Sequence, residues 1–468
     1  MAGRFIRKLR RISRQSVSLR LIAWALLVGA IGGAIVSMFR WVLEQLLHLA
    51  VRFYRFWPSS PWVLAVAVIV MLALGFAIAA LIASQPLISG SGIPDVERRL
   101  RTAGPVPFPW WDVLWKKVVG GILAIGPGAF AGREGPSIQM SACVGLGVSH
   151  ATTTTRRYTK ELVAAGAAAG LSAAFNAPVA AVLFVTEEIY GRFSLQIGLS
   201  SFAAALVSDA VSQQVFGLSP VFIFPNVTVP PIGDYWKIVL LAIVLGLFAW
   251  LYEVTLLRSG NVYERLHIPG GLRPFVPLLA TIPVGIWCPV LLGGGNMVIN
   301  TLSSVRYALP VLVGYLIVRF LLSQLTYGSG SPGGIFLPIL TLGALAGAAW
   351  NAMLGNVGLS PDMTSGTALM VVVGMAALFG AVSKAPLTAI ILVTEMTSYG
   401  VLMPLACATF IAYLVYDMMG GKPIYDALGE RHARSRRHRP GRMSPPTADA
   451  RHAPQRAATE PHTLPNLS

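Results

Sequence analysis

Three short runs rich in glycine and proline interrupt an otherwise apolar chain, and their chemistry suits the binding of an anion. They are GSGIP at 90–94, GREGP at 132–136 and GGIFLP at 333–338. Each run places proline where a helix can begin, because proline is favoured in a first turn and glycine permits unusual dihedral angles. Helix N-termini carry unpaired N–H groups and partial positive charge, so several that converge would bind an anion without a full cation. The glycines expected at these helix starts are Gly90, Gly92, Gly132, Gly135 and Gly334.

Acidic residues inside apolar sequence are the second chemical feature. Glu134 stands at the expected helix start of the second run, and a carboxylate at membrane depth must accept bonds from N–H groups or be protonated. An anion would compete with this carboxylate for the same donors, so anion occupancy and proton uptake at Glu134 should be linked. Glu187 and Glu188 are adjacent, and neighbouring helix positions point about 100° apart, so these two residues cannot share one role.

An internal repeat organises the chain. Residues 166–189 align without gaps on residues 374–397 with ten identities in 24 positions, and the G-x-x-x-P spacing of the second run returns in the third. Self-similarity of this kind indicates a duplicated structure. We therefore expect two homologous transmembrane halves, residues 21–220 and 232–426. Corresponding interrupted segments in two halves indicate a transport site at the interface of the repeats.

The repeat separates the roles of the two adjacent glutamates. Glu187 aligns with Glu395, which predicts a structural role common to both halves, such as bonding to unpaired backbone at a helix end. Glu188 aligns with Met396 and so breaks the symmetry. An acid without a counterpart inside a membrane segment is a candidate proton site. The alternative is an acid at the intracellular surface near Arg192.

The composition is that of a membrane protein with basic ends. Of 468 residues, 55% are hydrophobic and 12% charged, whereas roughly a quarter are charged in a soluble protein. Of the net charge of +17, residues 1–20 carry +7 and residues 427–468 carry +5. Basic flanks remain on the cytoplasmic side, so we expect a basic cytoplasmic N-terminal segment and a disordered basic cytoplasmic tail. Neither tail has the interleaved aromatic residues of a nucleic-acid-binding arm, so no nucleic-acid partner is expected.

The apolar segments vary in length, and several carry breaks. Residues 162–190 and 366–397 are too long for one perpendicular span of about 20 residues. Irregular backbone at membrane depth is tolerated only where protein or a water-filled cavity surrounds it. The sequence therefore predicts an all-α, polytopic membrane protein with broken helices. The apolar segments lie at about 21–50, 62–83, 113–131, 162–190, 196–217, 236–257, 275–293, 307–325, 334–354, 366–397 and 401–419.

The three glycine-rich runs, taken in chain order, resemble the three signatures of the chloride channel (CLC) family of chloride channels and chloride/proton exchangers. These signatures are GSGIP, G(K/R)EGP and GxFxP. AAFNAP at 173–178 and GGKPIY at 420–425 are also similar to family sequence. The resemblance covers residues 20–426. It implies two inverted-topology repeats with many tilted and partly spanning helices, assembled as a homodimer. The cytoplasmic regulatory domains of eukaryotic relatives do not fit after Asp426, so the resemblance implies a bacterial protein of the cytoplasmic (inner) membrane.

The resemblance also implies roles for single residues at the anion site. Ser91 and Tyr425 would each supply a hydroxyl group to the central anion. The backbone N–H groups of Ile335 and Phe336 would complete the site. These donors are neutral and oriented, so they could replace the hydration that the anion loses. Leu337 stands beside the donor backbone where many relatives have alanine.

For protons, the resemblance implies that Glu134 is the gate and Glu188 the internal proton-transfer residue. The carboxylate of the gate would occupy the site of the anion and leave it when protonated. We therefore expect a chloride/proton antiporter that transports chloride. Its expected partners are chloride, protons and the lipid bilayer. One alternative is a passive voltage- or pH-gated chloride channel, which differs only in coupling.

Two further function classes receive less support from the sequence. An organic-anion permease would need buried cationic side chains, and Arg319 is the candidate noted inside an apolar span. A membrane enzyme is not expected, because the chain has no H-E-x-x-H motif, nucleophile elbow or P-loop. Three cysteines lie far apart in apolar sequence, which argues against a metal cluster. No metal and no cofactor are expected.

Overall fold

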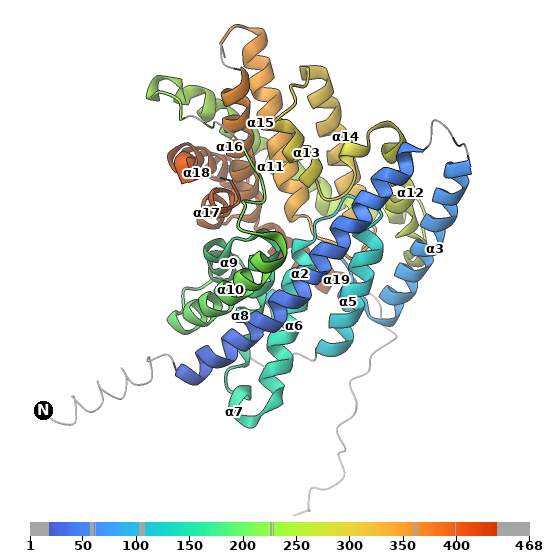
Figure 1. Ribbon diagram of the computed structural model, residues 1–468, viewed down its shortest axis with the longest axis vertical. Helices are drawn as coiled ribbons and strands as arrows, with labels where there is room; N and C mark the ends of the chain where they lie inside the picture. Colours follow the sequence, from blue (N-terminus) through green and yellow to red (C-terminus); the bar gives the residue numbers. More distant parts are fainter. Residues whose placement is uncertain are drawn as a thin grey trace, which may run out of the picture. The chain divides into compact units, whose positions relative to one another are not determined.

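Helices make up most of the described part of the chain. The computed structural model describes residues 18–56, 60, 62–102, 108–224, 227, 229–359, 363–397 and 399–437 (Figure 1). These residues contain no β-strand, and only Gly132 and Gly334 form an isolated antiparallel bridge. Seven of the described helices are long and apolar enough to cross a membrane. The all-helical fold expected from the sequence is confirmed.

The helices fall into two successive sets. The first half of the chain contains α2 (Leu19–Arg55), α3 (Trp62–Ser84), α4 (Ile93–Arg101), α5 (Trp110–Ile125), α6 (Glu134–Ala151), α7 (Thr153–Arg156), α8 (Thr159–Phe175), α9 (Pro178–Phe184), the π-helical turn η3 (Val185–Ile189) and α10 (Leu195–Phe216). The second half contains α11 (Tyr235–Arg265), α12 (Phe275–Trp287), α13 (Asn296–Leu302), α14 (Leu309–Gly328), α15 (Phe336–Asn356), α16 (Met363–Ser383), α17 (Pro386–Met396), α18 (Leu402–Met418) and α19 (Ile424–Arg437). Short 3-10 turns join some of them.

The two halves pack in the same pattern. Helix α6 lies on α8, and α10 lies on both α2 and α8; correspondingly, α15 lies on α16, and α18 lies on both α11 and α16. Aligned glycines allow matching close approaches. A Cβ atom on Gly166 would lie 2.1 Å from the carbonyl oxygen of Ser141, and one on Gly374 would lie 2.2 Å from that of Gly343. Small residues let membrane helices touch through their backbones, so the packing supports the repeat found in the sequence.

Both of the overlong apolar segments break at residues that the repeat aligns. Asn176 and Lys384 have left-handed φ angles of 53° and 54°. Each is followed by Ala-Pro, and the next helices, α9 and α17, begin at Pro178 and Pro386. Asparagine adopts this conformation more readily than lysine. The ammonium group of Lys384 pairs with Asp417 at 2.6 Å. The breaks expected from segment length are confirmed.

Helices α4, α6 and α13 lie outside the apolar segments of the sequence. Helix α4 is short and carries acidic Asp95 and Glu97 with three arginines in its last turn. Helix α6 contains Glu134 and Gln139, yet it is buried along most of its length. Because protein rather than lipid surrounds α6, its sequence does not need to be continuously apolar. The starts of α4, α6 and α15 at the three glycine-rich runs agree with the helix starts expected there.

Helix α19 changes the expected C-terminal boundary. It begins at Ile424 and runs to Arg437, so residues 427–437 are helical where the sequence predicts a disordered tail. Alanine, leucine, glutamate and arginine dominate this stretch, and all four favour helix. The rest of the predicted tail, residues 438–468, and residues 1–17 of the N-terminal segment lie outside the described residues.

Glu187 and Glu395 each cap a helix of the opposite half. Glu187 accepts hydrogen bonds from the backbone N–H and the hydroxyl group of Thr388 in the first turn of α17, at 2.8 and 2.7 Å. Glu395 accepts one from the N–H of Ala180 in the first turn of α9, at 2.8 Å. This reciprocal exchange is what a two-fold relation between the halves produces. The structural role predicted for the aligned pair is confirmed.

Removing either cap should destabilise the fold without abolishing it. We expect Glu187→Ala and Glu395→Ala each to lower the free energy of unfolding by about 1 kcal/mol, the usual cost of losing a helix cap. Tryptophan fluorescence during denaturant unfolding in detergent measures the change. Glu264→Ala is the control, because that carboxylate belongs to a side chain 66% exposed and lies 3.8 Å from Arg273. Equal stability of the cap variants and the control would contradict the capping role.

Candidate functional site

Backbone hydrogen bonds join the three glycine-rich runs. Gly132 and Gly334 each donate to the carbonyl oxygen of the other, both at 2.7 Å. Gly90 donates to the carbonyl of Gly330 at 3.3 Å and accepts from the N–H of Gly333 at 3.0 Å. Loops that lie far apart in the sequence therefore meet, and the helices α4, α6 and α15 begin at one place.

The helix starts approach one another so closely that only glycine fits between them. A Cβ atom on Gly135 would lie 2.7 Å from the Cβ of Ser91, and one on Gly334 would lie 3.0 Å from the backbone nitrogen of Gly135. Ser91 is buried, and its hydroxyl oxygen accepts from the N–H of Ile93 at 3.3 Å. The Ser91 side chain thus lies against the first turn of α6, and its hydroxyl proton can still be donated.

Glu134 is fully buried where α6 and α15 begin. Its Oε2 lies 2.1 Å from the place that a Cβ on Gly132 would occupy, and the same place is 3.2 Å from the backbone nitrogen of Leu337. The N–H groups of Glu134 and Leu337 face the carboxylate. Neither carboxylate oxygen meets the geometry of a hydrogen bond with any described residue. The carboxylate therefore fills a space that an anion could take.

Aromatic rings connect the start of α15 with Tyr425. Ile335 and Phe336 are buried at this helix start. The ring of Phe336 lies 5.6 Å from that of Phe184, which in turn lies 6.0 Å from the ring of Tyr425. Tyr425 is fully buried, and its hydroxyl group has no hydrogen-bond partner among the described residues. A buried hydroxyl without a partner is costly unless a ligand or water binds it.

Glu188 belongs to a second cluster, built around Arg101. It lies in η3, a π-helical turn. Such turns are rare in proteins overall, but those that occur often lie at functional sites. The Arg101 guanidinium donates to the backbone carbonyl of Glu188 and pairs with Glu97 at 2.6 Å and Asp426 at 2.7 Å. Glu188 is buried, and the charges near its carboxylate include those of Asp426, Arg101, Glu97 and the neighbouring glutamate. Sequence reasoning missed Arg101 and Asp426, which lie far from Glu188 along the chain.

Lys117 is a buried cation that sequence reasoning also missed. Its ammonium group is fully buried and donates to the carbonyl oxygens of Ile88 and Gly90 at 2.8 and 2.7 Å. It thereby fixes the loop that precedes α4 and carries Ser91. The available signal was a lysine within the apolar segment 113–131. Arg319 is therefore not the only cation inside an apolar span.

Arg319 serves the backbone of a loop. Its guanidinium donates to the carbonyl oxygens of Leu291 at 2.8 Å, Gly293 at 2.6 Å and Gly294. The same loop contacts Leu337, because a Cβ on Gly294 would lie 2.7 Å from the Cδ2 of that leucine. The larger side chain at position 337 thus packs on the loop before α13.

A charged network lies beside Glu134. Glu44 accepts from the Arg133 guanidinium at 2.7 Å and from Arg40 at 3.1 Å, and Arg40 also donates to Asn176 at 2.9 Å. Both arginines act electrostatically on Glu134. Two guanidinium groups and one carboxylate carry a net charge of about +1, which an ionised Glu134 would balance. When Glu134 is protonated, the same charge would favour a bound anion.

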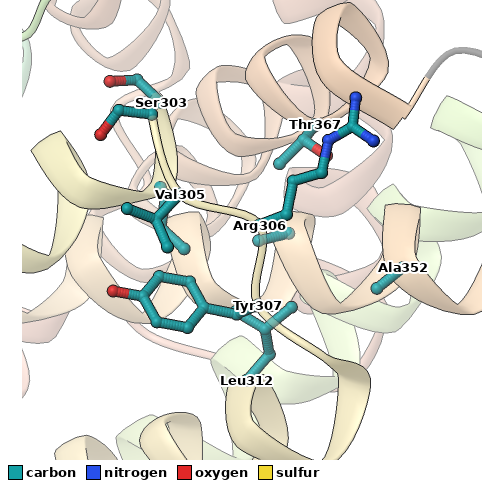
Figure 2. Close-up of a pocket in the computed structure, with 10 residues that line it drawn as sticks. Ser303, Val305, Arg306, Tyr307, Leu312, Ala352 and Thr367 are labelled. Carbon is teal, nitrogen blue, oxygen red and sulfur yellow. The ribbon is translucent and has the colours of Figure 1, made fainter.

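A small cavity of about 70 Å³ lies elsewhere. Figure 2 shows it beside Arg306 and Tyr307, on the loop that leads into α14, with Ala352 of α15 and Thr367 of α16 near it. Asn351 donates to the Thr367 hydroxyl at 2.8 Å. None of the residues that line this cavity belongs to the three runs or to the cluster of Arg101.

The comparison with known families agrees with this geometry. A family model described as voltage gated chloride channel matches residues 74–417. The chain belongs to this family. The H(+)/Cl(−) exchange transporter ClcA of Klebsiella pneumoniae (strain 342) is 31% identical over 442 residues, which cover 90% of this chain and 91% of the relative. ClcA of Vibrio parahaemolyticus serotype O3:K6 is 33% identical over 437 residues, 89% of this chain and 91% of the relative.

Solved structures of similar fold extend the comparison. A slow cyanobacterial Cl−/H+ antiporter has a TM-score of 0.81 and 30% sequence identity, with 90% of this chain and 100% of that chain covered. A eukaryotic CLC transporter has 23% sequence identity and a TM-score of 0.70, with 88% of this chain and 74% of that chain covered. At this identity, the likeness indicates the fold alone. This voltage-gated chloride channel family member therefore has the polytopic, two-repeat fold that its sequence predicts.

The charge of the network around Glu44 should affect the affinity for an anion. We expect Glu44→Gln to tighten chloride binding roughly two- to fivefold, because it removes a partly screened negative charge from beside the helix starts. Isothermal titration calorimetry of the detergent-solubilised protein measures the dissociation constant. Glu44→Asp retains the charge and should bind chloride like the unmodified protein. Unchanged or weaker binding in Glu44→Gln would contradict the electrostatic role of the network.

Proposed function

We propose that this protein exchanges chloride for protons across the bacterial cytoplasmic membrane. The observation that carries the proposal is the meeting of three helix starts around the buried carboxylate of Glu134. Partial charges on backbone N–H groups attract an anion but release it more easily than a fixed cation would. The names of the ClcA relatives and of the cyanobacterial antiporter support chloride and protons as the transported ions.

In the proposed anion site, chloride accepts hydrogen bonds from four donors. These are the hydroxyl groups of Ser91 and Tyr425 and the backbone N–H groups of Ile335 and Phe336. Burial of both hydroxyl groups, and the lack of a protein partner for the Tyr425 hydroxyl among the described residues, support this assignment. The glycines Gly90, Gly92, Gly132, Gly135 and Gly334 permit the close approach of the helix starts.

Glu134 acts as the gate in this proposal. Its ionised carboxylate competes with chloride for the N–H groups at the starts of α6 and α15. Protonation removes the charge that these groups attract, so the side chain leaves and an anion takes its place. Each exchange of carboxylate for chloride thus moves with a proton, which is the basis of coupling.

Glu188 is the internal proton acceptor. Tyr425 lies within electrostatic reach of both Glu134 and Glu188, which supports a proton route past this tyrosine. Arg101 and Asp426 hold the cytoplasmic end of the route in place through their ion pair at 2.7 Å. The π-helical turn gives Glu188 a direction that a regular helix would not.

Both termini lie on the cytoplasmic side in this proposal, as their basic flanks indicate. The protein acts as a homodimer with one pathway in each subunit, by its family membership. Transport needs no covalent chemistry, so we propose no enzymatic activity. An organic-anion permease finds less support, because the buried cations Lys117 and Arg319 bind backbone carbonyl oxygens.

A passive chloride channel is the competing function, and coupling separates the two. Reconstituted vesicles with a chloride gradient should drive proton movement against a pH gradient, and the reversal potential should depend on both ions. Simultaneous chloride and proton fluxes measure this. A reversal potential that follows chloride alone and ignores pH would favour the channel.

Substitution of the gate should separate anion flow from proton flow. We expect Glu134→Gln to abolish proton transport while chloride flux persists, because an amide cannot exchange a proton. Glu188→Gln should give the same loss of proton flux. Glu187→Gln is the matched control, since the adjacent carboxylate caps α17, and it should remain coupled. Proton transport that survives in Glu134→Gln would refute the gate.

A further inference from the structure

A cavity of about 400 Å³ opens where α4, α6 and α8 meet around the short helix α7. It lies at the last turn of α4 and the end of α6. The opposite ends of both helices begin where the three glycine-rich runs meet. The residues that line it are Arg99, Leu100, His150, Arg156, Thr159, Lys160 and Val163. Three of the seven are arginine or lysine, one is histidine and none is acidic.

Local hydrogen bonds fix the backbone of α7 and of the start of α8 beside this pocket. Thr152 and Thr155 form a capping box that fixes α7. The buried Thr155 hydroxyl also donates to the carbonyl of Ser149 at 3.0 Å, which ties α7 to the end of α6. The Thr159 hydroxyl donates to the carbonyl of Arg156 at 2.7 Å. The position of the Arg156 backbone is thus fixed, and a ligand would not have to order it.

Like charges gather at this pocket. His150 lies within electrostatic reach of both Arg99 and Arg156. Glu161 is the acidic residue nearest in sequence, and it acts electrostatically with Lys160 but does not line the pocket. Arg99, Arg156 and Lys160 line the same pocket, so an anion with several acceptor oxygens could accept from more than one of them.

The pocket lies on the cytoplasmic side in the topology proposed above. Arg101, two residues after Arg99 on α4, pairs with Asp426 at the start of α19. Figure 1 places α7 toward the same end of the molecule as the start of α2, which follows the basic N-terminal segment. Leu100 and Val163 provide buried apolar walls beside the cations. A basic recess with apolar walls at a membrane surface suits a phosphorylated headgroup.

We propose that this basic pocket binds a phosphate group, supplied by the headgroup of an anionic phospholipid or by a soluble phosphate. Bidentate bonds from arginine and a point charge from lysine are the usual partners of phosphate oxygens. The site is separate from the chloride site. Helix α4 joins the two over nine residues, a length of about 14 Å. The proposal does not depend on whether chloride transport is coupled to protons.

The test uses the full chain with a pocket variant and a matched control. The pocket variant combines Arg156→Gln and Lys160→Gln, both exposed positions that should tolerate the change. The control combines Arg157→Gln and Arg192→Gln, which are also exposed, remove the same charge and do not line the pocket. Circular dichroism and gel filtration establish that both variants fold.

Native mass spectrometry with phosphatidylglycerol, and with phosphatidylcholine as the neutral lipid, measures the retained lipid. We expect the unmodified protein and the control to retain phosphatidylglycerol in preference, and the pocket variant to bind it roughly tenfold more weakly. This result assigns the site to a lipid headgroup. A second arm adds inorganic phosphate to protein in phosphatidylcholine and follows the shift of thermal unfolding.

A shift by inorganic phosphate that the pocket variant loses, without a preference for phosphatidylglycerol, assigns the site to a soluble phosphate. Equal behaviour of the pocket variant and the control in both arms overturns the proposal, because the pocket would then add nothing to the general positive charge of this face. Chloride flux through both variants serves as a separate readout, so failure of transport cannot be mistaken for failure of phosphate binding.

Discussion

The structure depends on the need to satisfy backbone groups where helices are broken inside a membrane. Unpaired N–H and C=O groups there cost several kcal/mol each by general estimates. Gly132 and Gly334 meet this need by bonding to each other across the two halves. The same bonds bring the starts of α6 and α15 together, so the solution of a folding problem creates a concentrated, uncharged source of positive potential.

Several full charges inside this protein complete the backbone. Lys117 and Arg319 donate to carbonyl oxygens of broken segments, and Glu187 and Glu395 accept from N–H groups of first turns. Carbonyl oxygens thus attract positively charged side chains, and backbone N–H groups attract negatively charged ones. Glu134 departs from this pattern, because neither of its oxygens meets hydrogen-bond geometry with a described residue. A carboxylate left in this state is suited to exchange its place with an anion.

The sequence could predict what depends on local pattern and on the repeat. Helix starts at the three runs, the breaks in the long segments and the shared role of Glu187 and Glu395 all follow from spacing or alignment. The partners of Glu188 could not be predicted, since Arg101 lies 87 residues away along the chain and joins it through a backbone carbonyl. The start of α6 was expected at the second run, but its extent could not be predicted from apolar pattern, because burial in protein removes the need for an apolar sequence.

The two ends of α4 and α6 attract opposite charges. Their N-terminal ends offer N–H groups to a dehydrated ion, while their C-terminal ends carry partial negative charge that attracts cationic side chains. Arg99 and His150 would therefore be favourable at those ends even without any ligand. The dipoles of α4 and α6 do not account for Arg156 and Lys160, which come from α7 and α8 and complete a walled cavity rather than a flat basic surface.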